Sequence, residues 1–505
     1  MMTIELLTLK EYADAVKSAG KPYMAKVGDK EYEIKLTAVD GVRHFIEKIK
    51  NDKHNAVIEV FADAIDRAKE IDAKIARGEK VGRLAGVPII IKDNILFKGH
   101  KATAASKMLE NFVAPYTATI VERMLAEGAV ILGRANMDEF AMGTTGETSV
   151  YGAALNGFCN HNVKLNEKSN ATHHVAGGSS SGSAAAVAAS LCAAAIGTDT
   201  GGSIRCPAAW NGLYSLKPTY GTVSRYGIIA FASSLDQAGP ICKTAADTAL
   251  LLDVIRCKDE LHDATSVAFT PAKTPTPKKL RIGYVNEVWK HDKTIKDFKK
   301  YQDMFNDLKS AGHEIVPISI ENIDLALATY YIIAPAEAAS NLARFDGVRY
   351  TNAPANVGNL DALYKETRTK FFGDEVRRRI NLGNYVLSSG YFDAFYGKAK
   401  SVQAALRAEM NAAFEKCDVI IIPTTPAEAP KLNDPTLDKV SMYLIDLFTV
   451  VANICGTPAL CVPFGLGSEY GLPIGFQIMG REHSENLLFD AEKIIAGVIN
   501  AKYYW

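Results

Sequence analysis

Two glycine- and serine-rich stretches, Gly177-Gly178-Ser179-Ser180-Ser181-Gly182-Ser183 and Gly197-Thr198-Asp199-Thr200-Gly201-Gly202-Ser203-Ile204-Arg205, carry the most informative chemistry in this chain. Glycines let a backbone approach a ligand closely and let several N–H groups point the same way. Ser179 and Ser203 are 24 residues apart, which leaves room for one helix between the two stretches. The Ala-rich segment 184–196 predicts that helix. Such a helix would carry the chain from one wall of a pocket back to the other.

A third stretch, Gly86-Val87-Pro88-Ile89-Ile90-Ile91-Lys92-Asp93-Asn94, supplies a candidate base. Its apolar run predicts a buried strand, and Lys92 stands where that strand ends. In α/β proteins, side chains enter functional sites at strand ends. A lysine buried there loses proton affinity by desolvation, and a neutral lysine can act as a general base. For a single lysine, an ordinary surface position is the commoner outcome. Together, the three stretches indicate acyl transfer by a serine without histidine.

The turn around Ser203 has two interpretations. The backbone N–H groups of Thr200, Gly201, Gly202 and Ser203 can form an oxyanion hole around a carbonyl that Ser203 attacks. Taken alone, the same residues favour a tight turn with a capping serine, since glycine and serine dominate turns.

Ser180 is an alternative nucleophile. Residues 178–182 match the G-x-S-x-G elbow of α/β-hydrolases, which would pair Ser180 with a histidine. That elbow follows a buried strand, whereas Asn170-Ala171-Thr172-His173-His174 is poor strand material. The stretch also suits a flexible linker or helix N-caps. A phosphate cradle is disfavoured, because no Gly-Lys-Ser/Thr follows.

The bulk properties of the 505-residue chain are those of an ordinary globular enzyme. Lysine plus arginine and aspartate plus glutamate each number 57, so no overall basic field attracts nucleic acid or an anionic membrane. The eight cysteines form no CxxC pair, and His173-His174 has no acidic or cysteine companion, so we expect no metal in this chain. The N-terminus resembles neither a signal nor a transit peptide, and the longest apolar runs are too short to span a bilayer. These features predict a cytoplasmic protein.

Alternating strand and helix patterns predict an α/β fold: a single large domain over residues 1–505, with a mixed central sheet and helices on both faces. Within it we expect a mainly helical part at 1–76 (most clearly 8–76), the motif region at 77–260, and a pocket-forming and sheet-completing part at 280–505. Two surface segments are predicted, a polar loop at 158–174 and a proline-rich connection at 270–277. Buried strands are predicted at 87–91, 129–132, 418–423, 459–463 and 475–480.

These motifs resemble the core of the amidase signature family. The resemblance rests on Ile91-Lys92-Asp93-Asn94, Gly177-Gly178-Ser179-Ser180 and Asp199-Thr200-Gly201-Gly202-Ser203-Ile204-Arg205, including the spacing of the serines. It continues through Asn136–Gly143, Ser224–Gln237, Ala336–Tyr350 and Gly373–Ile380, which are similar to the family's branch of tRNA-dependent amidotransferase subunits.

A few positions depart from the pattern of the family and of this branch. Ser181 stands where the family usually has glycine, and Ala176 where it often has proline. Gly146 and Thr148, shortly after Gly143, differ from the branch's usual residues. The three motifs themselves are unaffected by these changes.

The resemblance implies roles for individual residues. Ser203 is implied to be the acylated nucleophile, Ser179 (after a cis peptide bond) the proton relay and Lys92 the base. The N–H groups of 200–203 are implied to form the oxyanion hole. For a glutamine substrate, the branch implies that Arg379 binds the carboxylate and Asp446 the amine, with Tyr330 as a pocket residue.

The branch also implies a function. The chain would hydrolyse glutamine and pass ammonia to its partners, the B and C subunits of a heterotrimer. There, ATP and Mg²⁺ would activate the misacylated tRNA, which is held mainly by the B subunit. No cofactor is expected in this chain. The principal alternative is a stand-alone amidase of the same fold acting on another amide; a serine esterase using Ser180 and a non-enzymatic scaffold are the others.

Overall fold

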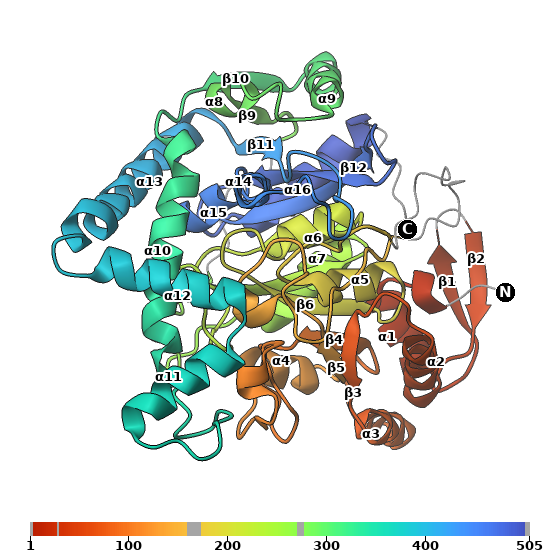
Figure 1. Ribbon diagram of the computed structural model, residues 1–505. Coiled ribbons are helices and arrows are strands. Elements are labelled where there is room, and N and C mark those ends of the chain that lie inside the picture. The colour runs from red at the N-terminus through yellow and green to blue at the C-terminus, as the bar shows by residue number, and fades with distance from the viewer. Residues whose placement is uncertain (1–3, 28–29, 159–172, 270–276, 500–505) are drawn as a thin grey trace.

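The computed structural model describes residues 4–27, 30–158, 173–269 and 277–499. Its centre is an 11-stranded mixed sheet in the order β10-β9-β11-β13-β12-β7-β8-β6-β4-β5-β3 (Figure 1). The strands are β3 (Val57–Val60), β4 (Pro88–Lys92), β5 (Val130–Ala135), β6 (Ala194–Asp199), β7 (Tyr214–Lys217), β8 (Gln237–Cys242), β9 (Arg281–Val285), β10 (Glu314–Ile318), β11 (Val419–Pro423), β12 (Ala459–Leu466) and β13 (Pro473–Met479). The predicted α/β fold with one mixed sheet is confirmed.

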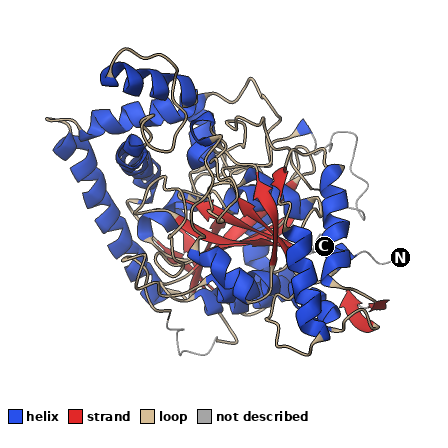
Figure 2. Ribbon diagram, turned by 90° about the horizontal axis from the view of Figure 1, so that it is seen from below, coloured by secondary structure: helices blue, strands red, loops and turns tan. Residues whose placement is uncertain are grey.

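Helices lie on both sides of this sheet (Figure 2). They are α1 (Leu9–Lys17), α2 (Ala38–Lys50), α3 (Ala64–Ala76), α4 (Thr119–Ala126), α5 (Ser181–Ala188), α6 (Arg205–Trp210), α7 (Ala245–Ile255), α8 (Asn286–Trp289), α9 (Phe298–Ser310), α10 (Ala326–Asn341), α11 (Leu360–Phe371), α12 (Asp374–Leu387), α13 (Lys398–Lys416), α14 (Lys439–Ile445), α15 (Val450–Cys455) and α16 (Glu485–Ile499). No helix in the described ranges combines the length and apolar character needed to cross a membrane.

The five strands predicted from apolar runs are all present, as β4, β5, β11, β12 and β13. Every residue of β4 is buried, as is every residue of β5 and β11. Strands covered on both faces read as continuous apolar runs, which is why these are visible in the sequence. Strands β4 and β5 are parallel, with α4 between them in the chain, so the predicted β-α-β connection is also confirmed.

The segment 8–76, predicted to be mainly helical, also holds strands that the sequence pattern does not predict. The segment contains three helices, but also β3 and a separate antiparallel pair, β1 (Tyr23–Val27) with β2 (Lys30–Ile34). These strands are short, and the helical periodicity on either side of them dominates the local pattern.

The prediction of one helix over the Ala-rich segment 184–196 is wrong in part, because α5 ends at Ala188 and Ala194–Ile196 belong to β6. Strand β6 pairs with β4 on one side and β8 on the other. These tertiary pairings override the helix propensity of alanine. Most of the predicted polar loop at 158–174 and of the connection at 270–277 lies outside the described residues.

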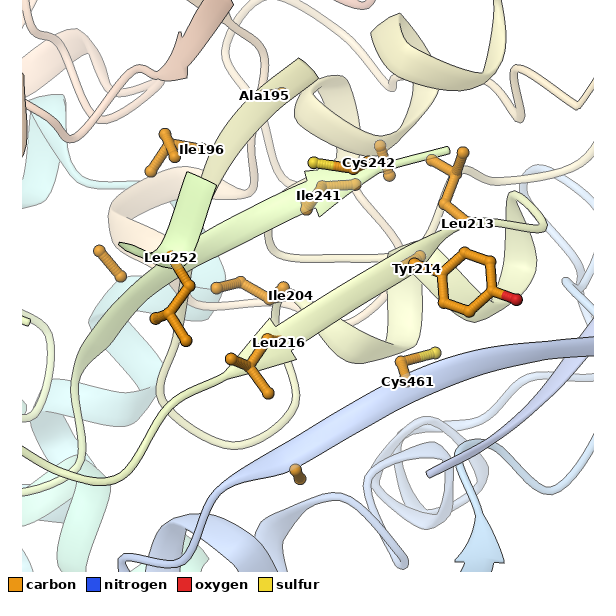
Figure 3. Packing of buried hydrophobic residues seen from close by; sticks show 14 of the residues in the cluster. Ala195, Ile196, Ile204, Leu213, Tyr214, Leu216, Ile241, Cys242, Leu252 and Cys461 are labelled. Atoms are coloured by element: carbon orange, nitrogen blue, oxygen red, sulfur yellow. The ribbon is translucent and has the colours of Figure 1, made fainter. Parts of the chain in front are cut away.

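The core packs directly behind the turn that follows β6. Ile204, the residue after Ser203, is fully buried and belongs to the same apolar cluster as Leu216 of β7, Ile241 of β8 and Leu252 of α7 (Figure 3). Because protein interiors are close-packed, this cluster fixes the position of the turn. The ends of β4 and β6 and the start of α5 therefore meet at one place on a rigid sheet.

Candidate active site

Strand β4 delivers Lys92 to the interior, where its side chain is fully buried. Its Nζ donates hydrogen bonds to Ser179 Oγ (2.8 Å), Ser180 Oγ (2.9 Å) and Thr198 Oγ1 (2.9 Å). Asn94, two residues further on, also donates to Thr198 Oγ1 (3.1 Å). The structure thus brings the lysine stretch and the serine stretches into direct contact.

Burial lowers the pKa of Lys92 to about 7, against the opposing charges of Asp138, Asp199 and Asp236. The charged form loses its hydration in the interior, whereas the neutral amine loses little. The neutral amine is therefore well populated at neutral pH. That is the protonation state a general base requires.

The three serines around Lys92 differ in their surroundings. Ser180 Oγ is fully enclosed: it donates to the Thr198 carbonyl (3.1 Å) and accepts from Lys92 and from the Thr198 N–H (3.2 Å). Ser180 also donates its backbone N–H to the carbonyl of Ser203 (3.0 Å), which sets the two stretches side by side. Ser203 keeps 7% of its surface exposed, whereas Ser179 and Ser180 keep none. The peptide bond between Gly178 and Ser179 is cis.

The turn that carries Ser203 is held by a buried ion pair. Asp199 accepts two hydrogen bonds from the Arg205 guanidinium (3.1 Å each) and one from Asn453 Nδ2 (2.9 Å). Burial alone would raise the pKa of Asp199, but the Arg205 guanidinium outweighs it and the pKa falls to about 2. The carboxylate also accepts the backbone N–H groups of Gly202 (2.8 Å) and Ile204 (3.2 Å), so it shapes the turn from inside.

Gly202 is required in this turn for two reasons. Its φ of +131° is a backbone conformation that side chains rarely allow, and an added Cβ would lie 2.3 Å from Thr449 Oγ1. Because the Gly202 N–H already donates to Asp199, the donors left in the turn are those of Thr200, Gly201 and Ser203. The backbone N–H groups of these three residues donate no hydrogen bond within the described residues.

A second anchor holds the start of the same turn. Thr200 Oγ1 donates to Asp236 (2.6 Å), whose other carboxylate oxygen accepts the Phe231 N–H (2.8 Å). Burial raises the pKa of Asp236 to about 6. The segment 231–236 is thereby tied to the turn.

Arg379 of α12 and Asp446, just after α14, are both buried and meet at one aromatic ring. Tyr331 donates from its hydroxyl to Asp446 Oδ2 (2.8 Å), and the Arg379 guanidinium lies 5.6 Å from the centre of the same ring. Arg379 uses Nε to bind Glu375 (2.7 Å), and its terminal nitrogens donate no hydrogen bond within the described residues. They remain available for a ligand.

Asp446 is connected to the Ser203 turn and to the Ser179 stretch through two threonines. The single hydroxyl proton of Thr449 is shared between the Gly201 carbonyl, 2.7 Å from Oγ1, and the Asp446 carbonyl, 3.2 Å away. Thr144 Oγ1 donates to Asp446 Oδ2 (3.3 Å), and its carbonyl accepts the Gly178 N–H (2.6 Å) beside Ser179. Thr449 therefore connects Asp446 to the Ser203 stretch, and Thr144 connects it to the Ser179 stretch.

Tyr330 lies against the turn. An added Cβ on Gly201 would fall 2.5 Å from the Tyr330 ring, so glycine is needed for this close approach. The Tyr330 ring also packs edge-on against Tyr331, at 5.0 Å between ring centres. The structure thus brings Tyr330, Arg379 and Asp446 together near the Ser203 turn.

Burial raises the pKa of Asp446 to about 7, although Tyr331, Arg379 and Thr144 all favour its ionised form. An ammonium group bound beside it would replace the lost hydration and favour the charged form further. The arrangement offers a cationic and an anionic group around one tyrosine ring, in a buried setting beside a serine turn. Chemically, it suits a small zwitterion.

Sequence reasoning misses several residues of this site, among them Thr449 and Asn453, which hold the Ser203 turn. Tyr331 and Thr144 hold Asp446, Thr198 holds Lys92, and Asp138 lies behind Gly178, where an added Cβ would meet its carboxylate. Thr198 lies inside the second glycine-rich stretch, yet nothing in a single sequence distinguishes a threonine that contacts a lysine from one that does not. Tyr331 follows Tyr330 in an apolar helix, and only the packing of that helix shows which ring carries a contact to Asp446.

The two adjacent histidines have separate surroundings: His173 is exposed, and His174 contacts the Ala429 carbonyl through Nδ1 (2.8 Å). No group of three or more histidine, cysteine or acidic side chains that could hold a metal occurs in the described ranges.

Comparison with known proteins defines the class. The family model described as Amidase matches residues 40–489. The chain belongs to this amidase family, the class of enzyme that the mixed sheet and the lysine–serine site define.

Its relatives narrow the class further. The chain is 45% identical over 465 residues to the glutamyl-tRNA(Gln) amidotransferase A subunit of Thermoanaerobacter pseudethanolicus, covering 90% of this chain and 92% of that protein. It is similar to the crystal structure of the glutamyl-tRNA(Gln) amidotransferase A subunit of Thermotoga maritima, with a TM-score of 0.71 at 36% identity, over 90% of each chain. A native peptide amidase from Stenotrophomonas maltophilia shares the fold at 28% identity, with a TM-score of 0.70 over 92% of this chain and 94% of that one.

Proposed function

We propose that this protein hydrolyses the side-chain amide of glutamine and supplies the ammonia to a tRNA-dependent amidotransferase. The observation that carries the proposal is the buried pair Arg379 and Asp446 meeting at Tyr331 beside the Ser203 turn. The terminal nitrogens of Arg379 donate no hydrogen bond and Asp446 forms no ion pair within the described residues, so a ligand with both a carboxylate and an ammonium best matches the two groups. The similarity to amidotransferase subunits supports the same substrate.

Catalysis starts at Ser203. Neutral Lys92 accepts the proton of Ser179, and Ser179 accepts that of Ser203, whose Oγ attacks the amide carbon. The C–O bond forms, the C–N bond breaks, and the proton held by the relay passes to the leaving nitrogen, which departs as ammonia. Water then attacks the ester by the same relay and releases glutamate and free Ser203.

The negative charge that develops on the carbonyl oxygen is stabilised by backbone N–H groups of the turn. We assign this role to Thr200, Gly201 and Ser203, because the Gly202 N–H is committed to Asp199. Gly202 contributes by its backbone conformation instead.

Substrate binding uses the two charges differently. The terminal nitrogens of Arg379 can grip the α-carboxylate bidentately. Asp446 Oδ1, which accepts no hydrogen bond within the described residues, pairs with the α-ammonium. Tyr330, which lies against Gly201 of the turn and edge-on against Tyr331, forms part of the wall of this pocket.

The ammonia is used by a partner. In this proposal the chain is the A subunit of a cytoplasmic heterotrimer, and the B and C subunits are its partners. A partner subunit uses ATP and Mg²⁺ to activate Glu-tRNA(Gln), or Asp-tRNA(Asn), and the B subunit holds most of the tRNA. The zero net charge of this chain supports that division, since tRNA affinity depends on positive charge.

The test is a substrate comparison on the purified chain and on its complex with the B and C subunits. Glutamine hydrolysis that is lost in Ser203→Ala, together with ammonia transfer to misacylated tRNA in the complex, supports the proposal. Hydrolysis of simple amides at rates equal to glutamine, with no tRNA-dependent transfer, would point to a stand-alone amidase.

A further inference from the structure

A groove is lined by the segment 228–230, and its only lining residue that contacts the Ser203 turn through a described side-chain hydrogen bond is Asp236, which binds Thr200. One part of the groove is an apolar cleft of about 280 Å³, walled by Leu96, Phe112, Ile228 and Phe345. A second, more polar hollow of about 410 Å³ adjoins it and shares Tyr116, Ile228, Ala230 and Arg344. We call the two together the 228 groove. Lys92, Ser179, Ser203, Arg379 and Asp446 do not line it.

The walls of the 228 groove are fixed by the fold. The Leu96 N–H donates to the Gly227 carbonyl (2.8 Å), and the Leu96 carbonyl accepts the N–H of Ala118 (2.9 Å). These bonds connect the wall around Leu96 to the wall around Ile228. The Tyr350 ring packs against Phe112 and Phe345, with ring centres 5.7 and 6.0 Å apart. A cleft that is already formed needs little reordering to accept a ligand.

The apolar surface continues outside the cleft. Tyr116 and Tyr350 at the mouth are each 39% exposed, and Val113 and Val348 beyond them are 49% and 55% exposed. A rim of exposed apolar side chains beside a preformed cleft is characteristic of a protein-binding surface. A small solute would fill the cleft and leave this rim in water.

The mouth is positively charged. Arg344 lines both parts of the groove and uses only Nε, which donates to the Asn341 carbonyl (3.0 Å). The charges of Arg344 and Arg349 both lie near the Tyr350 hydroxyl, where they oppose the rise in its pKa that burial causes. Neither arginine forms an ion pair within the described residues, although Asp346 also lies near Tyr350. The acids of the polar hollow already have partners: Asp236 binds Thr200, and Asp263 binds Arg225, which lines the same hollow.

We propose that the 228 groove binds an extended acidic segment of a partner chain, with one large apolar side chain in the cleft and a neighbouring carboxylate on Arg344. This inference rests on the proposed function, because it takes the partners of the amidotransferase as the source of the segment. A carboxylate matches the bidentate geometry of an unpaired guanidinium. An apolar anchor in a pocket, with a charged rim, is the usual anatomy of a binding hot spot.

Two other occupants fit less well. A second copy of this chain, paired through the same face, would bring the Arg344 and Arg349 charges of both copies together, and like charges across an interface are repulsive. Nucleic acid would satisfy the arginines but would leave the apolar cleft unfilled.

The first test measures binding. The full chain is mixed with purified B and C subunits from the same genome, and the dissociation constant is measured for wild type, Arg344→Glu and Tyr350→Ser. Arg43→Glu is the matched control, since Arg43 is an exposed arginine of α2. We expect each groove variant to weaken the complex at least tenfold and the control to change it less than twofold. Glutaminase activity of the isolated variants should stay within twofold of wild type, which shows that they are folded.

The second test maps the contact. A photo-crosslinking amino acid replaces Val113, and in a control chain it replaces Met24 of β1, which is 56% exposed. The expected product from position 113 joins this chain to an acidic segment of the B or the C subunit.

Crosslinks to tRNA or to a second copy of this chain would overturn the inference. So would unchanged binding by both groove variants in a complex that forms normally and hydrolyses glutamine. In that case the proposed function still stands. If the wild-type chain hydrolyses glutamine but forms no complex, the proposed partnership is wrong and the inference falls with it.

Discussion

The hydroxyl of half-buried Tyr331 donates a 2.8 Å hydrogen bond to Oδ2 of the buried Asp446, near the Ser203 turn. The ring of the same tyrosine faces the Arg379 guanidinium at 5.6 Å. One side chain therefore fixes the spacing between the positive and the negative group that we assign to glutamine binding. Tyr331 is a positioning residue, since it acts on the substrate through Asp446.

Replacing Tyr331 by phenylalanine should raise KM for glutamine and change kcat little. A hydrogen bond to a charged group contributes about 1.5–3 kcal/mol, so we expect KM to rise roughly 10- to 100-fold. Steady-state kinetics with glutamine and with a simple neutral amide measure this. The control is Tyr443→Phe, because the Tyr443 ring packs against Tyr331 at 4.2 Å but is partly exposed. Equal losses on both substrates would contradict a positioning role through Asp446.

The charges themselves give a second prediction. Arg379→Ala or Asp446→Ala should raise KM for glutamine by about two orders of magnitude or more, because each removes a charge that pairs with the substrate in a buried site. Rates with a neutral amide that has no α-carboxylate or α-ammonium should change little. If either variant loses activity on both substrates to the same extent, the residue supports the fold rather than glutamine binding.

The pH dependence of kcat should report Lys92. Its pKa is lowered by burial to about 7, so the amine is protonated below pH 7 and neutral above it. Only the neutral form accepts a proton, and kcat should therefore rise as pH increases through about 7 and then level off. Lys92→Arg should be inactive at every pH, because arginine stays protonated. Activity in the arginine variant would exclude Lys92 as the base.

Asp446 titrates in the same range, but it should affect a different kinetic constant. Burial raises its pKa to about 7, so the free enzyme loses the negative charge as pH falls below 7. We expect KM for glutamine to increase toward low pH in wild type and to lose this dependence in Asp446→Asn. The profiles of kcat and kcat/KM, measured on the same preparation, separate the two groups.

The two serines that compete as nucleophile should behave differently. Ser203→Ala should lower kcat by about three orders of magnitude or more, since it removes the attacking oxygen. Ser180→Ala should lower kcat only about tenfold. Ser180 Oγ helps to hold Lys92 and Thr198, but it has no exposed surface at which a substrate could bind. Trapping the acyl-enzyme and locating the modified serine by mass spectrometry decides between them. An acyl group on Ser180 would restore the elbow interpretation.

How much of this site can be predicted from the sequence follows from the kind of interaction involved. Continuous apolar runs such as 87–91 predict buried strands correctly, because a strand covered on both faces must be apolar throughout. The meeting of Lys92 with the serine stretches depends on the order of strands in the sheet, which the motifs imply only through the family resemblance. The helix prediction fails at 194–196 because pairing with β4 and β8 decides the conformation there, not the alanines.

Tyr331 and Thr144 show most clearly which contacts the sequence alone cannot predict. Their contacts to Asp446 join residues more than a hundred positions apart, from α10 and from the loop after Phe140. No local pattern marks such pairs. The same holds for Gly202: in the sequence its N–H is one of four equivalent donors, and only the bond to Asp199 sets it apart.

Two of the departures from the family pattern, Ser181 and Gly146, are in contact in the structure. An added Cβ on Gly146 would lie 2.6 Å from Ser181 Cβ, so glycine at 146 makes room for the serine at 181. Ser181 Oγ is buried and has no hydrogen-bond partner within the described residues. Ser181→Ala should therefore stabilise the protein by about 1 kcal/mol, because a buried unsatisfied hydroxyl is unfavourable. Denaturant unfolding measures this.

The contact between these positions predicts that their substitutions are not additive. Gly146→Ala should destabilise the protein in two ways, through backbone strain at φ +87° and through the clash with Ser181. Gly152→Ala isolates the strain, since Gly152 has the same φ of +87° and its nearest atom to an added Cβ is 3.5 Å away. In the Gly146→Ala, Ser181→Gly double variant the clash with Ser181 is relieved, and the strain, the 3.3 Å contact with the Gly177 carbonyl and the loss of helix propensity remain. The interaction free energy from this double-mutant cycle should be at least ~1 kcal/mol. Additive effects would mean that the backbone shifts to separate the two residues and that glycine at 146 serves the turn alone.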